Sequence, residues 1–246
     1  MGRVVTDPPI IALVTGAGRE REIGTAVCRA LAANGAAVAF TVAPGGDGGA
    51  LAAELGAEAI EADLADPGAA SAVLDEVARR LGRPPAVLVN NAGHSVNGGY
   101  AEVDAATLDE HYAVNVRTPV LLACELARRL PHGAPGRIVC LTSGQSLGPM
   151  PGELPYTTTK AALEMFVRQL APEVMRLGIT VNAVNPGVTD TGWVTEAIRA
   201  EVLARMPTGR LGESEDAARL IAWLCSADAG WVTGQVIGSE GGFLRG

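Results

Sequence analysis

The sequence lacks a basic cluster: 27 acidic residues outnumber 19 basic ones, which leaves a formal charge of -8 on 246 residues. This balance argues against nucleic acid or an anionic membrane surface as the main partner and favours a small molecule. No apolar run reaches the length of a membrane span, and residues 1–9 lack the apolar stretch of a signal peptide. We therefore expect a cytoplasmic protein, with a flexible N-terminus over residues 1–8.

Cysteine and lysine are both scarce. The four cysteines stand singly in apolar segments, which suits buried thiols better than a disulfide framework. No group of His, Cys and Asp has metal-ligand spacing, so we expect no metal site. Lysine occurs only as Lys160, beside 18 arginines. A site that needs a tunable ammonium cannot accept arginine, so Lys160 is either a leftover codon or a functional residue.

Apolar runs of strand length alternate with segments of helical period. A first strand is expected over residues 10–15, and a helix follows from Ile23 to a stop at Asn34 and Gly35. Further strands are expected over residues 37–41, 58–62, 87–90, 137–142, 180–185 and 235–237. Parallel strands need crossover connections. The alternation therefore predicts one α/β domain over residues 1–246, with a doubly wound parallel sheet of Rossmann type.

The residues that follow these strands are informative, because ligands of such sheets bind beyond the carboxyl ends of the strands. The strand ends carry a glycine turn (16–24), Asp63, Asn-Asn-Ala-Gly (90–93), Ser143 with the pair Tyr156 and Lys160, and Asn-Pro-Gly (185–187). Together with Asn115, this set resembles the short-chain dehydrogenase/reductase family over almost the whole chain. Residues 144–148 and 186–192 are most similar to its 3-oxoacyl-(acyl-carrier-protein) reductase branch.

Tyr156 and Lys160 suggest a catalytic role through their spacing alone. Four residues apart on a helix, they share one face, so the ammonium would lower the phenol's pKa towards the range useful for general acid catalysis. Ser143 would donate a hydrogen bond to the substrate oxygen. The resemblance implies that Asn115 holds a water between Lys160 and solvent. We expect these four residues to be catalytic, although each could singly be structural.

The resemblance implies a nicotinamide nucleotide in contact with Gly16, Gly18, Arg19, Arg21, Ile23, Gly24, Thr41, Asp63, Asn91, Ala92, Gly93, Tyr156, Lys160, Pro186, Gly187 and Thr189. No acidic residue ends the second strand, where an NAD-preferring site would hold the ribose hydroxyls. NADP is therefore favoured over NAD. Arg19, Arg21 or both would meet the 2'-phosphate, with Thr41 adding a hydroxyl, unless these arginines are merely solvated.

The glycine turn departs from the family's pattern. It is two residues longer than usual, and Glu22 stands where the family has its middle glycine. A carboxylate here would repel a pyrophosphate unless it points away or pairs with Arg19 or Arg21. An enlarged turn is also similar to that of the enoyl-thioester reductases of the same superfamily. Their Tyr and Lys are spaced differently, so the spacing of Tyr156 and Lys160 favours carbonyl chemistry.

Substrate contacts are expected at His94, Gly144, Gln145, Met150 and Trp193. Of these, His94 could equally be a satisfied loop histidine. By resemblance, residues 187–211 form a mobile lid whose apolar side chains either cover a substrate or pack the domain. Related chains form homotetramers through the helices that contain Asn115 and Tyr156, so we expect the same assembly.

The sequence therefore predicts an NADP-dependent reductase of a ketone or 3-oxoacyl thioester, with a small carbonyl or alcohol substrate. Two alternatives remain open: oxidation of a small secondary alcohol, and a nucleotide-binding regulator without turnover.

Overall fold

A computed structural model describes residues 9–243 of the chain. The flexible N-terminus expected over residues 1–8 lies outside this range. Within it, a parallel seven-stranded sheet has the order β3-β2-β1-β4-β5-β6-β7, which confirms the doubly wound α/β prediction. The strands are β1 (Ile11–Val14), β2 (Ala37–Val42), β3 (Glu58–Glu61), β4 (Val87–Asn90), β5 (Gly136–Leu141), β6 (Ile179–Asn185) and β7 (Val236–Gly238).

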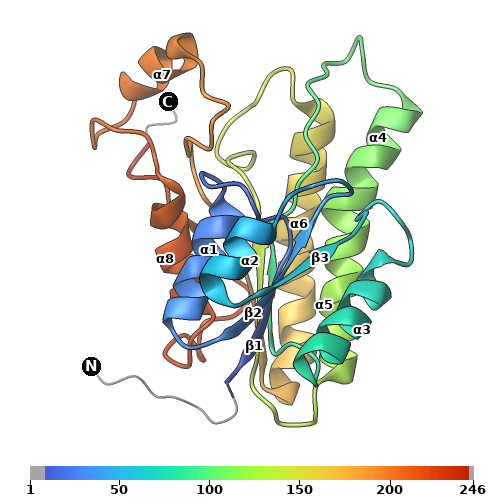
Figure 1. Ribbon diagram of the computed structural model, residues 1–246. Coiled ribbons are helices and arrows are strands. Elements are labelled where there is room, and N and C mark those ends of the chain that lie inside the picture. The colour runs from blue at the N-terminus through green and yellow to red at the C-terminus, as the bar shows by residue number, and fades with distance from the viewer. Residues whose placement is uncertain (1–8, 244–246) are drawn as a thin grey trace.

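Helices cover both faces of the sheet (Figure 1). One layer holds α1 (Ile23–Ala33), α2 (Gly49–Leu55) and α8 (Ser214–Leu224). The other holds α3 (Ala69–Leu81), α4 (Ala105–Tyr112), α5 (Thr118–Arg129) and α6 (Leu154–Val174), with a π-helical turn over Ala113–Arg117 between α4 and α5. A 3-10 turn, Met175–Leu177, ends α6, and α7 (Glu196–Leu203) projects from the domain beyond β6.

The apolar strands supply two cores, one on each face of the sheet. In β1, Val14 packs with α1 and α8, whereas its neighbour Leu13 packs with α3, α5 and α6. Successive side chains of a strand point to opposite faces, so a continuous apolar run serves both layers at once. Burial of such a side chain contributes about 1.5–3 kcal/mol. Cys28, Cys140 and Cys225 are free thiols buried in these cores, as the sequence predicts, while Cys124 is only partly buried.

The strand order reverses direction between β1 and β4, which is where sheets of this type bind ligands. The loops after these two strands therefore face the same crevice. The segment 187–211, expected to form a lid, contains α7 and has a small apolar cluster of its own, formed by Val202, Met206 and Leu211. Among residues 9–243, no helix is both long and apolar enough to cross a membrane.

Candidate functional site

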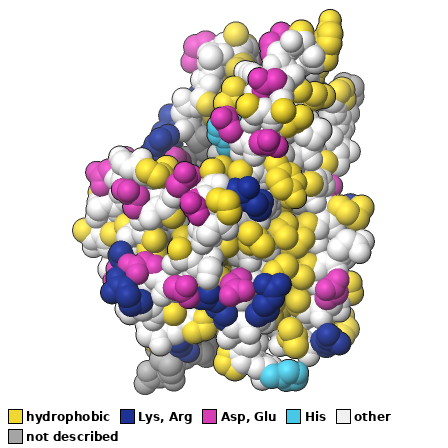
Figure 2. Space-filling view, turned by 90° about the vertical axis from the view of Figure 1, so that its right-hand side faces the viewer, with side chains coloured by type: hydrophobic (Ala, Val, Ile, Leu, Met, Phe, Trp, Pro, Cys, Tyr) yellow, Lys and Arg dark blue, Asp and Glu magenta, His cyan; other side chains and the backbone are white. Residues whose placement is uncertain are grey.

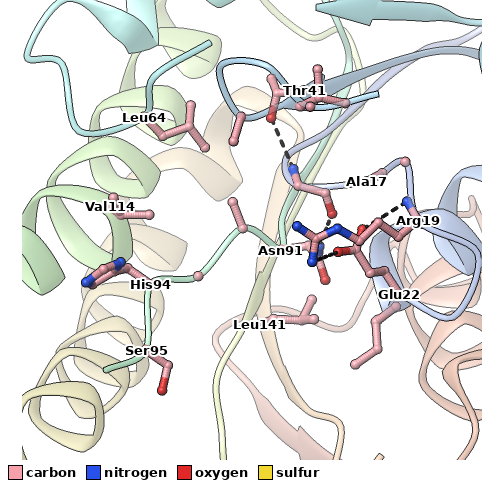
Figure 3. Close-up of a pocket in the computed structure, with 18 of the residues that line it drawn as sticks. Ala17, Arg19, Glu22, Thr41, Leu64, Asn91, His94, Ser95, Val114 and Leu141 are labelled. Carbon is pink, nitrogen blue, oxygen red and sulfur yellow. Dashed lines mark hydrogen bonds and ion pairs between the residues drawn. The ribbon is translucent and has the colours of Figure 1, made fainter. Parts of the chain in front are cut away.

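A cleft of about 600 Å³ opens at the carboxyl ends of β1, β2, β4 and β5. Figure 3 shows Thr41 and Leu64 along one side of it, Arg19 and Glu22 along another, and His94 across from them. Of the predicted nucleotide contacts, it is lined by Gly16, Gly18, Arg19, Ile23, Thr41, Asp63, Asn91, Ala92, Gly93, Tyr156, Lys160 and Pro186. The fold thus brings together segments from most of the chain's length.

The glycine turn packs too closely for side chains at three positions: Gly16, Gly18 and Gly24. Gly16 has φ +71°, and a Cβ there would lie 2.8 Å from the Cα of Ala92. A Cβ on Gly24 would lie 2.1 Å from the Gly16 carbonyl oxygen. That oxygen accepts a 2.6 Å hydrogen bond from Nδ2 of Asn91, and the Gly16 amide donates to the Thr41 hydroxyl at 3.1 Å. The turn is therefore fixed between the ends of β2 and β4, and its backbone lies open to the cleft.

The lengthened part of the turn separates the two arginines. Arg19 lines the cleft with a side chain 89% exposed. Glu22 accepts a hydrogen bond from the Arg19 amide at 3.2 Å and lies 3.7 Å from the Arg19 guanidinium. Of the two arginines that could pair with this carboxylate, Arg19 is therefore the partner. Arg21 instead points to Asp190, with 2.9 Å between the charged atoms, and does not line the cleft.

Other predicted nucleotide contacts also serve the fold. Thr41 is buried, and its hydroxyl accepts the hydrogen bond from the Gly16 amide. Asp63 lines the cleft and accepts a hydrogen bond from the Ala65 amide at 2.9 Å. Neither Gly187 nor Thr189 lines the cleft; the Thr189 hydroxyl donates to the Pro186 carbonyl at 2.9 Å.

Several residues line the cleft that were not predicted from the sequence to do so: Val42, Ala43, Pro44, Gly46, Asp47, Leu64, Ser95, Val114, Leu141, Thr142 and Thr191. Most directly follow a strand or flank a predicted contact, and that adjacency was the available signal. Asp47 lacked it, because it lies several residues beyond β2 in an exposed loop. Its carboxylate accepts a hydrogen bond from the Gly49 amide at 2.8 Å.

The predicted catalytic side chains meet at one end of the cleft. Tyr156 and Lys160 lie on the first turns of α6, and the Lys160 ammonium is 5.5 Å from the centre of the Tyr156 ring. This ammonium is buried and donates to the carbonyl oxygen of Leu141 at 2.9 Å. Ser143, just after β5, hydrogen-bonds with Tyr156 through its side chain. A serine hydroxyl and a phenol therefore stand side by side above a buried cation.

Burial shifts the pKa values of both α6 residues. It raises the pKa of Tyr156 to about 12, an effect that the Ser143 hydrogen bond opposes and the nearby charge of Glu153 reinforces. It lowers the pKa of Lys160 to about 8. From the sequence, the ammonium is expected to lower the phenol's pKa. In this structure the direction is opposite, because desolvation of the phenolate dominates.

Asn115 is fully buried in the π-helical turn between α4 and α5. Its Oδ1 accepts from the His94 amide at 2.7 Å, and its Nδ2 donates to the His94 carbonyl at 2.8 Å and to the Thr159 hydroxyl at 3.0 Å. A π turn inside a helix often marks a functional site. Here it aims one amide at both the loop after β4 and at α6, and so ties the residues around Lys160 together.

The predicted substrate residues do not all reach the cleft. His94 lines it, and its ring packs edge-on against the buried His111 at 4.5 Å between centroids. Gly144 is buried, and Met150 is partly buried outside the cleft lining. Trp193 is 55% exposed and donates from Nε1 to the Thr189 carbonyl at 3.0 Å. Gln145 turns inward towards α6 rather than towards the cleft.

Among residues 9–243, no group of three or more His, Cys, Asp or Glu side chains is placed to hold a metal ion. The side chains at the catalytic end of the cleft are instead hydroxyls, an amide and one ammonium. Such groups orient an oxygen atom and move protons to and from it.

Comparisons with known proteins agree with this geometry. A family model described as enoyl-(acyl carrier protein) reductase matches residues 16–244. The uncharacterized oxidoreductase YjdA of Bacillus subtilis is 47% identical over 245 residues, 96% of this chain and 97% of the relative.

Two of the similar solved structures match over almost their whole length. A short-chain dehydrogenase/reductase from Serratia marcescens is 34% identical with a TM-score of 0.86, covering 95% of this chain and 97% of that one. A blue fluorescent protein from a metagenomic library, in complex with NADPH, is 34% identical with a TM-score of 0.88, covering 96% and 98%.

Proposed function

The chain belongs to the short-chain dehydrogenase/reductase family of NAD(P)-dependent oxidoreductases, and we propose that it uses NADPH to reduce a ketone or 3-oxoacyl thioester to the alcohol. One observation carries the proposal: a single cleft is lined by the open backbone of the glycine turn and by Tyr156 and Lys160. Nucleotide binding and proton transfer can therefore take place in the same cavity. A nucleotide-binding regulator without turnover would not need Tyr156 and Lys160 in the cleft.

The residues present fit a dinucleotide phosphate. Gly16 and Gly24 have no side chain where the turn packs most closely, and the N-terminus of α1 follows the turn, so backbone amides and the helix dipole favour an anion there. Arg19 is the cation of the turn that lines the cleft and would meet the 2'-phosphate, while Arg21 is held by Asp190. The NADPH complex of the metagenomic relative supports this choice of cofactor.

The nicotinamide, when bound, supplies the hydride to the carbonyl carbon. The hydroxyls of Ser143 and Tyr156 would hold the substrate oxygen, and Tyr156 would give it a proton as negative charge develops there. The phenolate left behind would regain a proton from Lys160, whose pKa of about 8 lets it release one near neutral pH. The Leu141 carbonyl and Asn115 fix the ammonium's surroundings during this exchange.

The protonation state of Tyr156 favours reduction over alcohol oxidation. With a pKa of about 12, the phenol is protonated at neutral pH, as a general acid must be. Oxidation would need the phenolate, which burial disfavours. The description of the matching family model names an enoyl thioester as the substrate. The spacing of Tyr156 and Lys160 favours a carbonyl instead, and a thioester substrate remains part of the proposal.

We also propose that the chain forms a homotetramer. Figure 2 shows hydrophobic side chains gathered along the face of the molecule made by α4 and α5. Exposed apolar residues lie on α4, α5 and α6: Leu108, Tyr112, Leu121 and Met165. A contiguous exposed patch of this kind is typical of an interaction surface. Light scattering of the purified protein would test the assembly, and a monomeric mass would exclude it.

The first test is a titration with NADPH and, separately, NADH, followed by nicotinamide fluorescence. We expect tighter NADPH binding. Arg19→Ala should remove the preference, whereas Asp47→Asn should preserve or strengthen it because it removes a negative charge from the cleft. A panel of ketones and 3-oxo esters then tests turnover, with Tyr156→Phe as the inactive control. Turnover by that variant at the native rate would exclude Tyr156 as the general acid.

A further inference from the structure

A buried carboxyl group, Glu164, lies on α6 behind the catalytic residues. It is 5% exposed, and it stands on the same helix face as Tyr156 and Lys160, since each is four residues from the next. Two side chains of the loop after β5 donate to its Oε1: Gln145 through Nε2 at 2.6 Å and Ser146 through its hydroxyl at 2.8 Å. A buried polar group with this many contacts organises the segment that supplies them.

The Gln145 amide continues the connection to the catalytic serine. Its Oε1 accepts a hydrogen bond from the Ser143 amide at 3.1 Å. The reverse orientation of this amide would set an NH2 group against the Ser143 N–H and an oxygen against the Glu164 carboxyl, so both of its bonds would be lost. Glu164 therefore selects the orientation in which Gln145 can hold the Ser143 backbone.

These contacts form a closed loop of interactions. Glu164 holds Gln145, Gln145 holds the Ser143 backbone, and the Ser143 side chain meets Tyr156. The first and last residues of this series of contacts, Tyr156 and Glu164, both lie on α6, about two turns apart. The loop after β5 is thereby fastened at its far end as well as at the reacting hydroxyls.

We propose that Glu164 is a positioning residue, which acts through Gln145 to hold the Ser143 hydroxyl against Tyr156. This inference rests on the proposed function, because it assigns Glu164 to the same carbonyl reduction. Glu164 does not itself touch the cleft. Its remaining charged neighbour, Arg168, is 3.9 Å away and half exposed, and so does not replace the loop as the main partner.

Three variants separate this role from simple stability. Glu164→Leu removes the acceptor, Glu164→Gln retains an acceptor oxygen of the same reach, and Ser146→Ala removes the second donor while leaving the Gln145 link. With NADPH and ethyl acetoacetate as probes, we expect kcat to fall about tenfold to a hundredfold for Glu164→Leu. Glu164→Gln and Ser146→Ala should stay within about threefold of the native rate. The affinity for NADPH should not change, because the network lies away from the glycine turn.

A further measurement distinguishes positioning from a general loss of packing. In hydrogen exchange, the Ser143 amide should exchange at least about tenfold faster in Glu164→Leu than in the native protein, and at the native rate in Ser146→Ala.

The exchange measurement needs no substrate, so it remains decisive if the native protein fails to reduce the ester and the proposed function is wrong. Native exchange of the Ser143 amide in Glu164→Leu would overturn the inference. So would a fall in kcat for Glu164→Gln equal to that for Glu164→Leu, because an acceptor would then not suffice. Combining Glu164→Leu with Gln145→Ala should cost no more than either change alone if both act through one link.

Discussion

Replacement of Gly24 by alanine tests how tightly the glycine turn is packed on α1. The added Cβ would stand 2.1 Å from the Gly16 carbonyl oxygen and 2.6 Å from Nδ2 of Asn91. Ordinary contacts of a methyl carbon lie near 3.5 Å, so the turn and the helix must separate by about 1 Å. Neither obstacle is free to move, because Asn91 donates to that same carbonyl and the Gly16 amide donates to Thr41.

The cost follows from these contacts. Overpacking costs about 1–3 kcal/mol, and each stretched hydrogen bond adds about 1 kcal/mol. Alanine recovers about 1 kcal/mol through its higher helix propensity. We therefore expect Gly24→Ala to lose about 2–4 kcal/mol of unfolding free energy. If the variant folds with the turn displaced, its NADPH affinity should fall by at least about tenfold, because the backbone amides no longer face the phosphates.

Urea unfolding and NADPH fluorescence titration measure the two effects separately. Gly148→Ala is the matched control, since a Cβ there meets nothing within 4 Å. It should unfold within about 0.5 kcal/mol of the native protein. If Gly24→Ala matched the native protein in both assays, the turn would have room that the structure denies, and the packing argument would be refuted.

Three further changes have definite expected outcomes. Asn115→Leu leaves the His94 backbone and Thr159 without their partner, so stability should fall by about 2–4 kcal/mol in urea unfolding. Burial raises the pKa of the Cys28 thiol to about 12. The folded state therefore keeps a proton that the unfolded state releases above pH 9, and stability falls as pH rises. Between pH 9 and 10 the native protein should lose about 1 kcal/mol more than Cys28→Ala. Glu22→Gln removes the negative charge beside Arg19, and NADPH should bind as tightly as before or tighter, which fluorescence titration would show.

The sheet could be predicted because its central strands are buried on both faces. Runs such as residues 10–15 are almost wholly apolar, so their positions are visible in the sequence to within about one residue at each end. The ends of the strands then locate the cleft. Gly16 and Asn91 follow from this logic without any knowledge of the tertiary contacts, whereas Tyr156 was identified through its spacing from Lys160 and the family resemblance.

Side-chain directions in loops could not be predicted in the same way. Arg19 and Arg21 are equivalent in the sequence, and only the distant Asp190 separates them. Gln145 was expected at the substrate, but its partner Glu164 lies on another element and turns it inward. The direction of the Tyr156 pKa was also wrong, because spacing reports the nearby ammonium but not the degree of burial.

The enlarged glycine turn shows how a local departure in sequence acquires a structural meaning. Its Arg21 carbonyl accepts a 2.6 Å bond from the Ser214 hydroxyl at the start of α8, and its side chain pairs with Asp190. Asp190 also binds Arg199 of α7 at 2.6 Å. Exposed ion pairs contribute little singly, but this acidic side chain is only 12% exposed and bridges two arginines. The lengthened glycine turn is therefore joined to the segment 187–211 through Asp190. A change in the length of the turn would consequently affect the position of this segment.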